Sequence, residues 1–149
     1  MLWYASGPAR ISEGIPASAF SKGDILMFDS ASSLSRIPDS SNSVGALANG
    51  HVIGVAMASS LQSYNNLVPY LVADRDTVMW SDCTTGSQFT AGESLDVEYT
   101  GATFRVTTSV ITPMVRIVPH GGSKNLHDIS SAKSLVRCKF DETMLQFRA

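Results

Sequence analysis

Short apolar or alternating runs, each ended by Gly, Pro, Ser, Asn or Asp, recur along most of this 149-residue chain. In residues 95–99 and again in residues 136–140, apolar side chains alternate with polar or charged ones. A spacing of two returns side chains to the same face of a β-strand, whereas one face of a helix needs a spacing near 3.6. Helical spacing is nearly absent, so the pattern predicts an all-β fold.

The runs predict about eight or nine short strands, joined mainly by β-hairpins between sequence neighbours. The predicted strands are residues 24–28, 34–37, 50–58, 67–72, 77–80, 95–99, 102–107, 113–118 and 134–140. Helix is expected only in short stretches near residues 46–48, 61–64 or 141–147. Strands of this number and length are typical of a small barrel or a sandwich, and the pattern does not choose between the two.

Individual residues refine three of these elements. Residues 50–58 are apolar on both faces, which predicts a central strand, and Gly54 within it marks a bulge or a close approach of another backbone. Pro69 has no amide hydrogen, so it confines residues 67–72 to a sheet edge or a strand start. Residues 73–76 have the polar composition of a hairpin turn between 67–72 and 77–80.

The length suits one domain, which we divide into an extended N-terminal arm (residues 1–18), a β domain (19–140) and a C-terminal tail (141–149). The arm carries the residues that we predict to contact a partner, because exposed aromatic and aliphatic side chains commonly anchor interfaces. They are Leu2, Trp3, Tyr4, Ile11 and Ile15. The alternative is that the arm packs on its own domain.

The composition favours a protein partner over nucleic acid or a membrane. Charged residues make up 16% of the chain, less than in most soluble domains, and the formal net charge is −2. Few charges favour a surface that lies permanently against another protein. The dispersed Lys and Arg side chains do not predict binding to nucleic acid, and no apolar run is long enough to span a membrane. The first residues do not resemble a signal peptide, so we expect synthesis in the cytoplasm.

Residues suited to catalysis or metal binding form no recognisable motif. The sequence lacks the G-x-S-x-G pentapeptide of serine hydrolases, and its three histidines have no metal-ligand spacing. Convergence of His120 with His127 and Asp128, or a cleft around Asp74 and Asp76, is a minor alternative. The set Glu93, Asp96 and Glu98 is expected to line a solvated strand face. Cys83 and Cys138 are expected to be buried free thiols. We therefore predict no enzyme activity, cofactor or metal.

Four segments, taken in order and spacing, resemble the small capsid-decoration (cement) proteins of tailed bacteriophages. They are Ala19–Leu26, Gly50–Ala56, Gly92–Val97 and Ile129–Phe140. These segments are similar to the "kGD" strand start, the "iiGvA" strand, the "G-e-x-l" strand start and the terminal strand of that family. Residues 62–66 and the tail after Phe140 depart from the family pattern, so contacts made by those parts are not carried over.

The resemblance implies a β-barrel-like domain on the outside of an assembled phage head, where it clamps neighbouring major capsid subunits. It also implies self-association as a trimer or around local symmetry axes, and location on the exterior of the virion. Two alternatives stay open: another virion β module of the tail or head fibre, and a small carbohydrate-binding or hydrolytic β-barrel.

Overall fold

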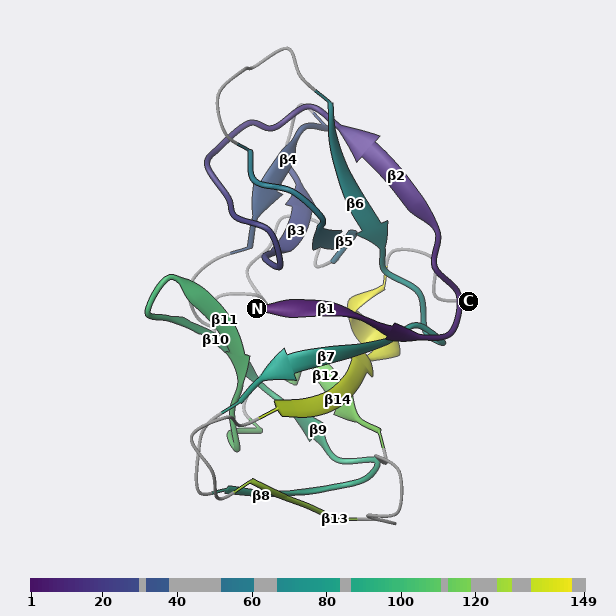
Figure 1. The fold of residues 1–149 in the computed structure, drawn as a ribbon, viewed down its shortest axis with the longest axis vertical. Helices are drawn as coiled ribbons and strands as arrows, with labels where there is room; N and C mark the ends of the chain where they lie inside the picture. Colours follow the sequence, from purple (N-terminus) through teal and green to yellow (C-terminus); the bar gives the residue numbers. More distant parts are fainter. Residues whose placement is uncertain are drawn as a thin grey trace.

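The computed structural model describes residues 1–29, 32–37, 52–60, 67–83, 87–110, 113–118, 126–129 and 135–145. Within these residues the chain is nearly all β, with two five-stranded antiparallel sheets and two two-stranded ribbons (Figure 1). The large sheets form a sandwich-like arrangement, and the described strands do not close into a barrel. The all-β prediction is confirmed, and of the two architectures that the sequence left open, the sandwich is observed.

Sheet A has the strand order β1-β7-β14-β12-β9, and sheet B has the order β2-β6-β5-β3-β4. The strands of sheet A are β1 (Leu2–Ser6), β7 (Val78–Asp82), β14 (Leu135–Phe140), β12 (Val115–Ile117) and β9 (Ser94–Leu95). Those of sheet B are β2 (Ile11–Gly14), β6 (Val68–Val72), β5 (Gly54–Ala56), β3 (Ile25–Phe28) and β4 (Leu34–Arg36). One ribbon pairs β10 (Val97–Thr100) with β11 (Thr103–Val106), and the other pairs β8 (Ser87–Thr90) with β13 (Leu126–Ile129).

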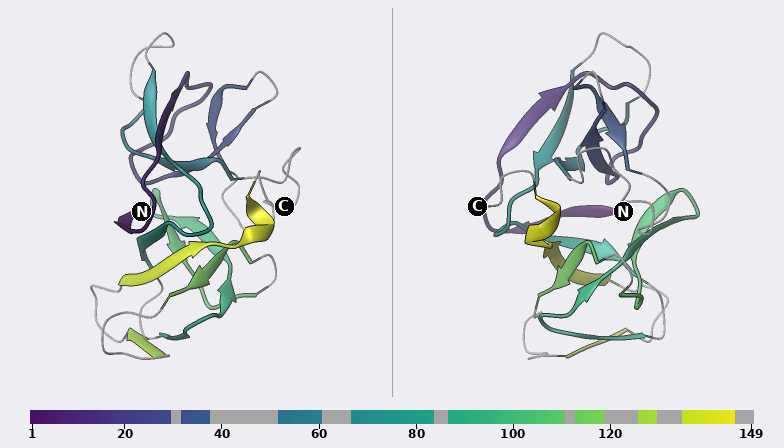
Figure 2. Two further views of the ribbon diagram at one scale, coloured as in Figure 1. Left: turned by 90° about the vertical axis from the view of Figure 1, so that its right-hand side faces the viewer. Right: turned by 180° about the vertical axis from the view of Figure 1, so that it is seen from behind.

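Each of the nine predicted ranges contains a strand, but the described residues hold fourteen strands rather than eight or nine. Two of the unexpected strands, β1 and β2, lie in the first 18 residues, and β8 and β13 form the second ribbon. The predicted helices near residues 46–48 and 61–64 lie outside the described residues. In the C-terminal tail, Glu142–Met144 form one short 3₁₀ helix, visible from the side in Figure 2.

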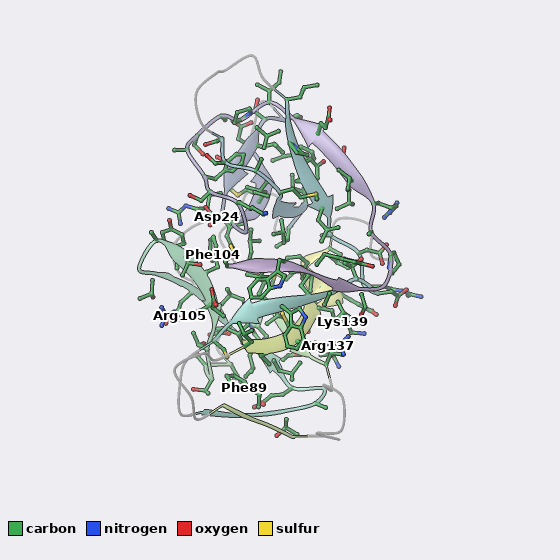
Figure 3. All side chains as sticks on the ribbon, in the orientation of Figure 1. Asp24, Phe89, Phe104, Arg105, Arg137 and Lys139 are labelled. Carbon is green, nitrogen blue, oxygen red and sulfur yellow. The ribbon has the colours of Figure 1, made fainter. Side chains whose placement is uncertain are left out.

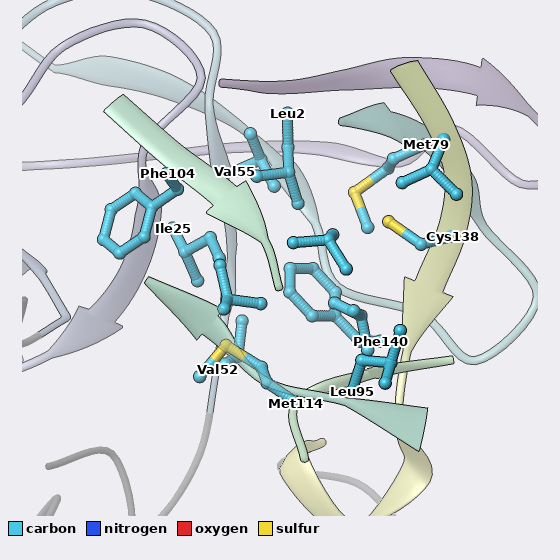
Figure 4. Close-up of a cluster of buried hydrophobic side chains, with 14 of the residues drawn as sticks. Leu2, Ile25, Val52, Val55, Met79, Leu95, Phe104, Met114, Cys138 and Phe140 are labelled. Carbon is cyan, nitrogen blue, oxygen red and sulfur yellow. The ribbon is translucent and has the colours of Figure 1, made fainter. Parts of the chain in front are cut away.

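The main hydrophobic core lies between the two sheets (Figure 4). Sheet A contributes the inward side chains of Leu2, Met79 and Phe140, and sheet B contributes Ile25 and Val55. A second cluster lies on the other face of sheet B and holds Phe20, Leu26, Leu34, Ile53, Ala56, Val68 and Tyr70. Sheet B is therefore apolar on both faces. This explains why its three central strands, β6, β5 and β3, read as continuous apolar runs rather than strict alternation.

Sheet B curls around this second cluster. Its last strand, β4, returns to the residues that follow β2, where Pro16 and Leu34 form a parallel bridge. The Ala17 amide donates to the Leu34 carbonyl at 2.8 Å, and the Leu34 amide donates to the Ile15 carbonyl at the same distance. The edge of β4 is thus hydrogen-bonded by the chain itself, which reduces the exposed edge available for pairing with another molecule.

Gly54 and Pro69 occupy the positions that their chemistry predicts. Gly54 is in β5, the central strand of sheet B, where an added Cβ would overlap the Leu71 carbonyl oxygen of β6 and lie 2.8 Å from Cδ2 of Tyr70. The predicted close approach of another backbone is confirmed. Pro69 is the second residue of β6, so the predicted strand start is confirmed as well. Its carbonyl accepts the amide of Met57 at 3.0 Å, one residue beyond the end of β5.

Residues 73–77 do not form the predicted hairpin, because β6 belongs to sheet B and β7 belongs to sheet A. The local turn chemistry is as expected, with the Asp76 amide donating to the Asp74 carboxylate at 2.9 Å. The turn, however, carries the chain from one sheet to the other. Polar turn residues specify that the chain changes direction, whereas the sheet that the next strand joins depends on where its apolar face can be buried.

Residues 7–10 make the same crossing between β1 and β2, and the two crossings are bonded to each other. Nη2 of Arg10 lies 3.2 Å from Oδ2 of Asp74. The Thr77 hydroxyl donates to the Pro8 carbonyl. These contacts hold the two sheets together at one end of the sandwich.

The residues predicted as an arm are extended, and they are paired with the rest of the domain. β1 is an outer strand of sheet A and pairs with β7, while β2 is an outer strand of sheet B and pairs with β6. Leu2 is 1% exposed and belongs to the main core. Of the two alternatives for residues 1–18, packing on the same domain is the one observed.

Asp96 corrects one prediction about charge. Its side chain is buried, and its carboxylate accepts a hydrogen bond from the Ser109 hydroxyl at 2.7 Å. The chain leaves sheet A at this residue, because β9 ends at Leu95 and β10 begins at Val97. The prediction that Glu93, Asp96 and Glu98 line one solvated face is therefore wrong for Asp96, which fixes a corner between two strands.

Cys83 and Cys138 are buried and free, as predicted. Burial raises the pKa of each thiol to about 12. With this pKa, roughly one thiol in ten thousand is ionised at pH 8. Since the thiolate is the reactive form, both thiols should react slowly in the folded protein. We expect Ellman's reagent to label the folded protein only as fast as it unfolds, with a rate that rises with urea concentration. Labelling of both thiols in the folded protein at the rate of free cysteine would contradict this.

Candidate binding surface

The five residues predicted to contact a partner fall into three places. Leu2 is in the core and makes no surface. Trp3 lies on the outer side of sheet A, whereas Tyr4 is exposed and donates its hydroxyl hydrogen to the Gly7 carbonyl at 2.7 Å. Ile11 and Ile15 lie together on sheet B, with 58% and 48% of their side chains exposed. The structure thus brings only the two isoleucines into one cluster.

The isoleucines form part of an exposed stripe on the face of β2 and β6 that also carries Leu71. Ile11 pairs with Leu71 and Glu13 pairs with Pro69, so alternate residues of both strands share this face. Ile15 and Leu67 follow the last registered pair, Gly14 and Val68, and extend the row. The side chains of Ile11, Ile15, Met57, Leu67 and Pro69 define what we call the β2–β6 stripe, and the exposed Glu13 lies on the same face between the two isoleucines.

Exposure along the β2–β6 stripe is high for such large apolar side chains. Leu67 is 58% exposed and Met57 is 40% exposed. The same face of β6 buries Leu71 in the main core, so the stripe begins at the core and runs outward to solvent. An exposed cluster of aliphatic side chains is typical of an interaction site rather than of ordinary surface.

Sequence reasoning missed three members of the stripe, Met57, Leu67 and Pro69. Met57 and Leu67 each sit next to a strand rather than within it, so nothing in the local pattern shows which way their side chains point. The sequence contained one hint of this surface: Leu67 and Pro69 are two residues apart, so they share one face of a strand. The pairing of β2 with β6 shows that this face is the one that carries Ile11.

A second surface lies on the outer side of sheet A. Trp3 is paired with Trp80, and Trp80 is paired in turn with Arg137, so the three residues form a row across β1, β7 and β14. Lys139 is two residues beyond Arg137 on the same face of β14, opposite Arg116 (Figure 3). Both tryptophans are half-buried.

The two carboxyls whose pKa is shifted, those of Asp24 and Asp141, are engaged in structural contacts. Burial raises the pKa of the Asp24 carboxyl, which accepts the Ser21 amide at 2.9 Å. Burial also tends to raise the pKa of Asp141, but hydrogen bonds from Thr143 and Ser94 and the charge of Arg116 outweigh it, so the pKa is lowered. Neither carboxyl faces a second carboxyl in the paired manner that acid–base hydrolysis uses.

The described residues show no arrangement that supports the two minor alternatives, a cleft around Asp74 and Asp76 and a site formed by His120, His127 and Asp128. Asp74 is bonded to Arg10 and to the Asp76 amide. His120 lies outside the described residues, and His127 pairs with Phe89 in the ribbon of β8 and β13. In the described part of the chain, no three His, Cys, Asp or Glu side chains gather as a metal site would require. None of the helices described there has the length and apolar character needed to cross a bilayer.

Comparisons with protein-family models, with curated proteins and with solved structures found no match to this chain.

Proposed function

We propose that this protein is a virion structural component that binds the outer surface of an assembled phage capsid and stabilises it by clamping neighbouring major capsid subunits. The β2–β6 stripe is the surface proposed to touch the shell. Under this proposal the protein self-associates on the capsid as a trimer or around a local symmetry axis. No catalytic group, cofactor or metal takes part.

The observation that carries the proposal is the exposed aliphatic cluster on a rigid sheet face. Two of its members, Ile11 and Ile15, are residues that the sequence singled out as partner contacts. Burying each exposed aliphatic side chain against a partner contributes up to about 2 kcal/mol. The pairing of β2 with β6 already holds Ile11 and Pro69 in place, so these two bind without a further entropy cost for ordering a loop. The resemblance to decoration proteins supplies the identity of the partner.

The proposed stabilisation works by mass action. A protein that binds the expanded shell and not the immature one lowers the free energy of the expanded state by RT ln(1 + c/Kd) per site, where c is its free concentration and Kd its dissociation constant. Many copies act in parallel on one shell, so a modest affinity per copy is sufficient. The low charge of the chain suits such an interface, because fewer charges must be desolvated.

A test uses purified protein and expanded heads of the phage that encodes it. We expect the protein to sediment with the heads and to raise their melting temperature, in hundreds of copies per particle. Failure to bind or to stabilise the heads would overturn the proposal. Binding of a few tens of copies at one vertex would instead identify a tail or head-fibre module.

The substitution Ile15→Asp tests the surface itself. It places a charge beside Leu67 in the β2–β6 stripe and is expected to weaken attachment at least tenfold, with stability changed by less than about 1 kcal/mol because the side chain is exposed. Val110→Asp is the matched control, since Val110 is 60% exposed outside the stripe. Urea unfolding and co-sedimentation measure the two quantities. Equal attachment of both variants would exclude the stripe as the docking surface.

A further inference from the structure

We infer that the outer face of sheet A is a second binding surface, for an anionic polysaccharide built from uronic acid sugars. We call it the tryptophan–arginine face and define it by Trp3, Trp80, Arg137 and Lys139. This inference goes beyond the proposed capsid attachment and uses none of the residues of the β2–β6 stripe.

The first step is the placement of the two tryptophans. Trp3 and Trp80 are directly paired across β1 and β7, so their side chains leave the same face of sheet A side by side. Their strand neighbours Leu2, Met79 and Ser81 point the other way and are buried. Both indoles thus lie half-buried on the solvent side of sheet A, held by the pairing of β1 with β7, and together they offer an aromatic surface on which the C–H face of a sugar ring can stack.

The second step is the charge beside the indoles. Arg137 is the direct neighbour of Trp80 on β14, and Lys139 follows on the same face. The guanidinium carbon of Arg137 lies 5.8 Å from the centre of the Trp80 ring, within the range of a cation–π contact. Nη2 of Arg137 donates to the Ser6 hydroxyl at 3.0 Å. These contacts hold the guanidinium next to the aromatic surface, with Nε buried and without a hydrogen-bond partner among the described residues. A carboxylate would therefore be received by the Nη atoms.

The third step is that the nearby carboxylates are already engaged. Asp82 lies 2.8 Å from the amino group of Met1 at one end of the face. At the other end, Asp141 lies 3.6 Å from Arg116 and accepts the Ser94 hydroxyl. Within the described residues, neither Arg137 nor Lys139 has a carboxylate partner. The face is therefore locally positive on a chain whose net charge is −2.

Two aromatic rings beside two cations suit a polymer that combines ring faces with regularly spaced carboxylates. Single-stranded nucleic acid also stacks on aromatic side chains, but its affinity comes mainly from neutralising a row of phosphates. Two cations on an acidic chain do not provide such a row. A purely acidic peptide would form ion pairs with Arg137 and Lys139, but it has no ring that stacks on the two indoles. The chemistry that uses all four residues is a uronic acid polymer.

Tryptophan fluorescence tests the inference directly, because Trp3 and Trp80 are the two tryptophans of the chain and both are on this face. The full chain is titrated with polygalacturonate at low ionic strength, and separately with neutral dextran, polyglutamate and oligo(dT). We expect a saturable change in tryptophan emission with polygalacturonate, binding that weakens as salt is added, and no saturable change with dextran.

Substitutions then locate the binding. Arg137→Gln is expected to weaken polygalacturonate binding about tenfold, as the loss of a charge-assisted hydrogen bond does. Trp3→Ala is expected to weaken it comparably while leaving Trp80 as the reporter. Arg75→Gln, which changes an exposed arginine in the 73–77 crossing, is the control and should bind as the unaltered protein does. Ile15→Asp should also bind normally, so the result is independent of the proposed capsid attachment.

Several results would overturn the inference. Absence of a saturable signal with polygalacturonate would exclude the ligand class. Equal binding of polyglutamate would show that charge alone acts, and tighter binding of oligo(dT) would assign the face to nucleic acid. If Trp3→Ala and Arg137→Gln reduced attachment to heads but not polygalacturonate binding, the face would be a protein interface instead. Circular dichroism of each variant confirms that the fold is intact before binding is compared.

Discussion

Gly54→Ala is expected to destabilise the protein by about 3 kcal/mol or more, a large share of the total stability of a domain this size. Gly54 pairs with Val72 in the centre of sheet B, and an added methyl group would overlap the Leu71 carbonyl oxygen and lie within 3.0 Å of its carbonyl carbon. Neither atom can move without opening the ladder between β5 and β6. Urea unfolding, followed by far-ultraviolet circular dichroism, measures the loss.

Two other glycines provide matched controls for this steric explanation. A Cβ at Gly14 would lie 2.8 Å from Cγ of the buried Leu34, a smaller overlap than at Gly54 and one with a side chain rather than with paired backbone, so Gly14→Ala should cost less. Gly92 has a φ of +85° and open space around it, so Gly92→Ala should cost only the strain of a left-handed backbone, about 1 to 2 kcal/mol. A Gly54→Ala loss no greater than that of Gly92→Ala would refute the close approach of β5 and β6.

Leu2→Ala is expected to cost about 2 to 5 kcal/mol, the usual range for a leucine truncated inside a core. Leu2 is fully buried between the sheets with Met79 and Val55, although it is the second residue of the chain (Figure 4). Its amide also donates to the Gly23 carbonyl at 3.0 Å, which ties β1 to the start of β3. The loss should appear in thermal and urea unfolding.

Ile11→Ala is the appropriate comparison for Leu2→Ala. Both residues are aliphatic and both fall in the first 18 residues, but Ile11 is 58% exposed. Its truncation should change stability by no more than about 0.5 kcal/mol and instead weaken attachment to the shell. If both variants were equally stable and equally impaired in attachment, the first strand would be a detached arm rather than part of sheet A.

This pair of variants separates two roles that the sequence alone assigned to one segment. An aromatic and aliphatic N-terminal segment is consistent both with docking on a partner and with completing a sheet. The pairing of β1 with β7 places Leu2 inside and Trp3 outside. Within five residues the same strand therefore supplies a core side chain and a candidate ligand contact.

The two candidate surfaces differ in chemistry and in location. The β2–β6 stripe is aliphatic and lies on sheet B, whereas the tryptophan–arginine face is aromatic and basic and lies on sheet A. A protein on the exterior of a particle can hold the shell with one surface and present the other to its surroundings. Ile15→Asp and Arg137→Gln are expected to impair different activities, which makes the two proposals independently testable.

The spacing of apolar residues in the sequence was sufficient to predict the fold class and the positions of the longer strands. Period-two spacing is a local property, because neighbouring side chains of a strand point to opposite faces whatever the strand pairs with. The backbone roles of Gly54 and Pro69 were also predictable, because they depend on local chemistry: glycine has no Cβ and proline has no amide hydrogen. The buried state of Cys83 and Cys138 also followed from residue type and composition.

Which strands share a sheet, and which side chains share a surface, could be read from the tertiary structure but not from the sequence. The turn at residues 73–77 has the chemistry of a hairpin, yet it joins two sheets, because strand pairing depends on long-range burial rather than on the turn. Asp96 became buried because the chain changes direction there and Ser109 binds its carboxylate. Trp3, Trp80 and Arg137 are distant in sequence, and antiparallel pairing across three strands is what brings them into one row.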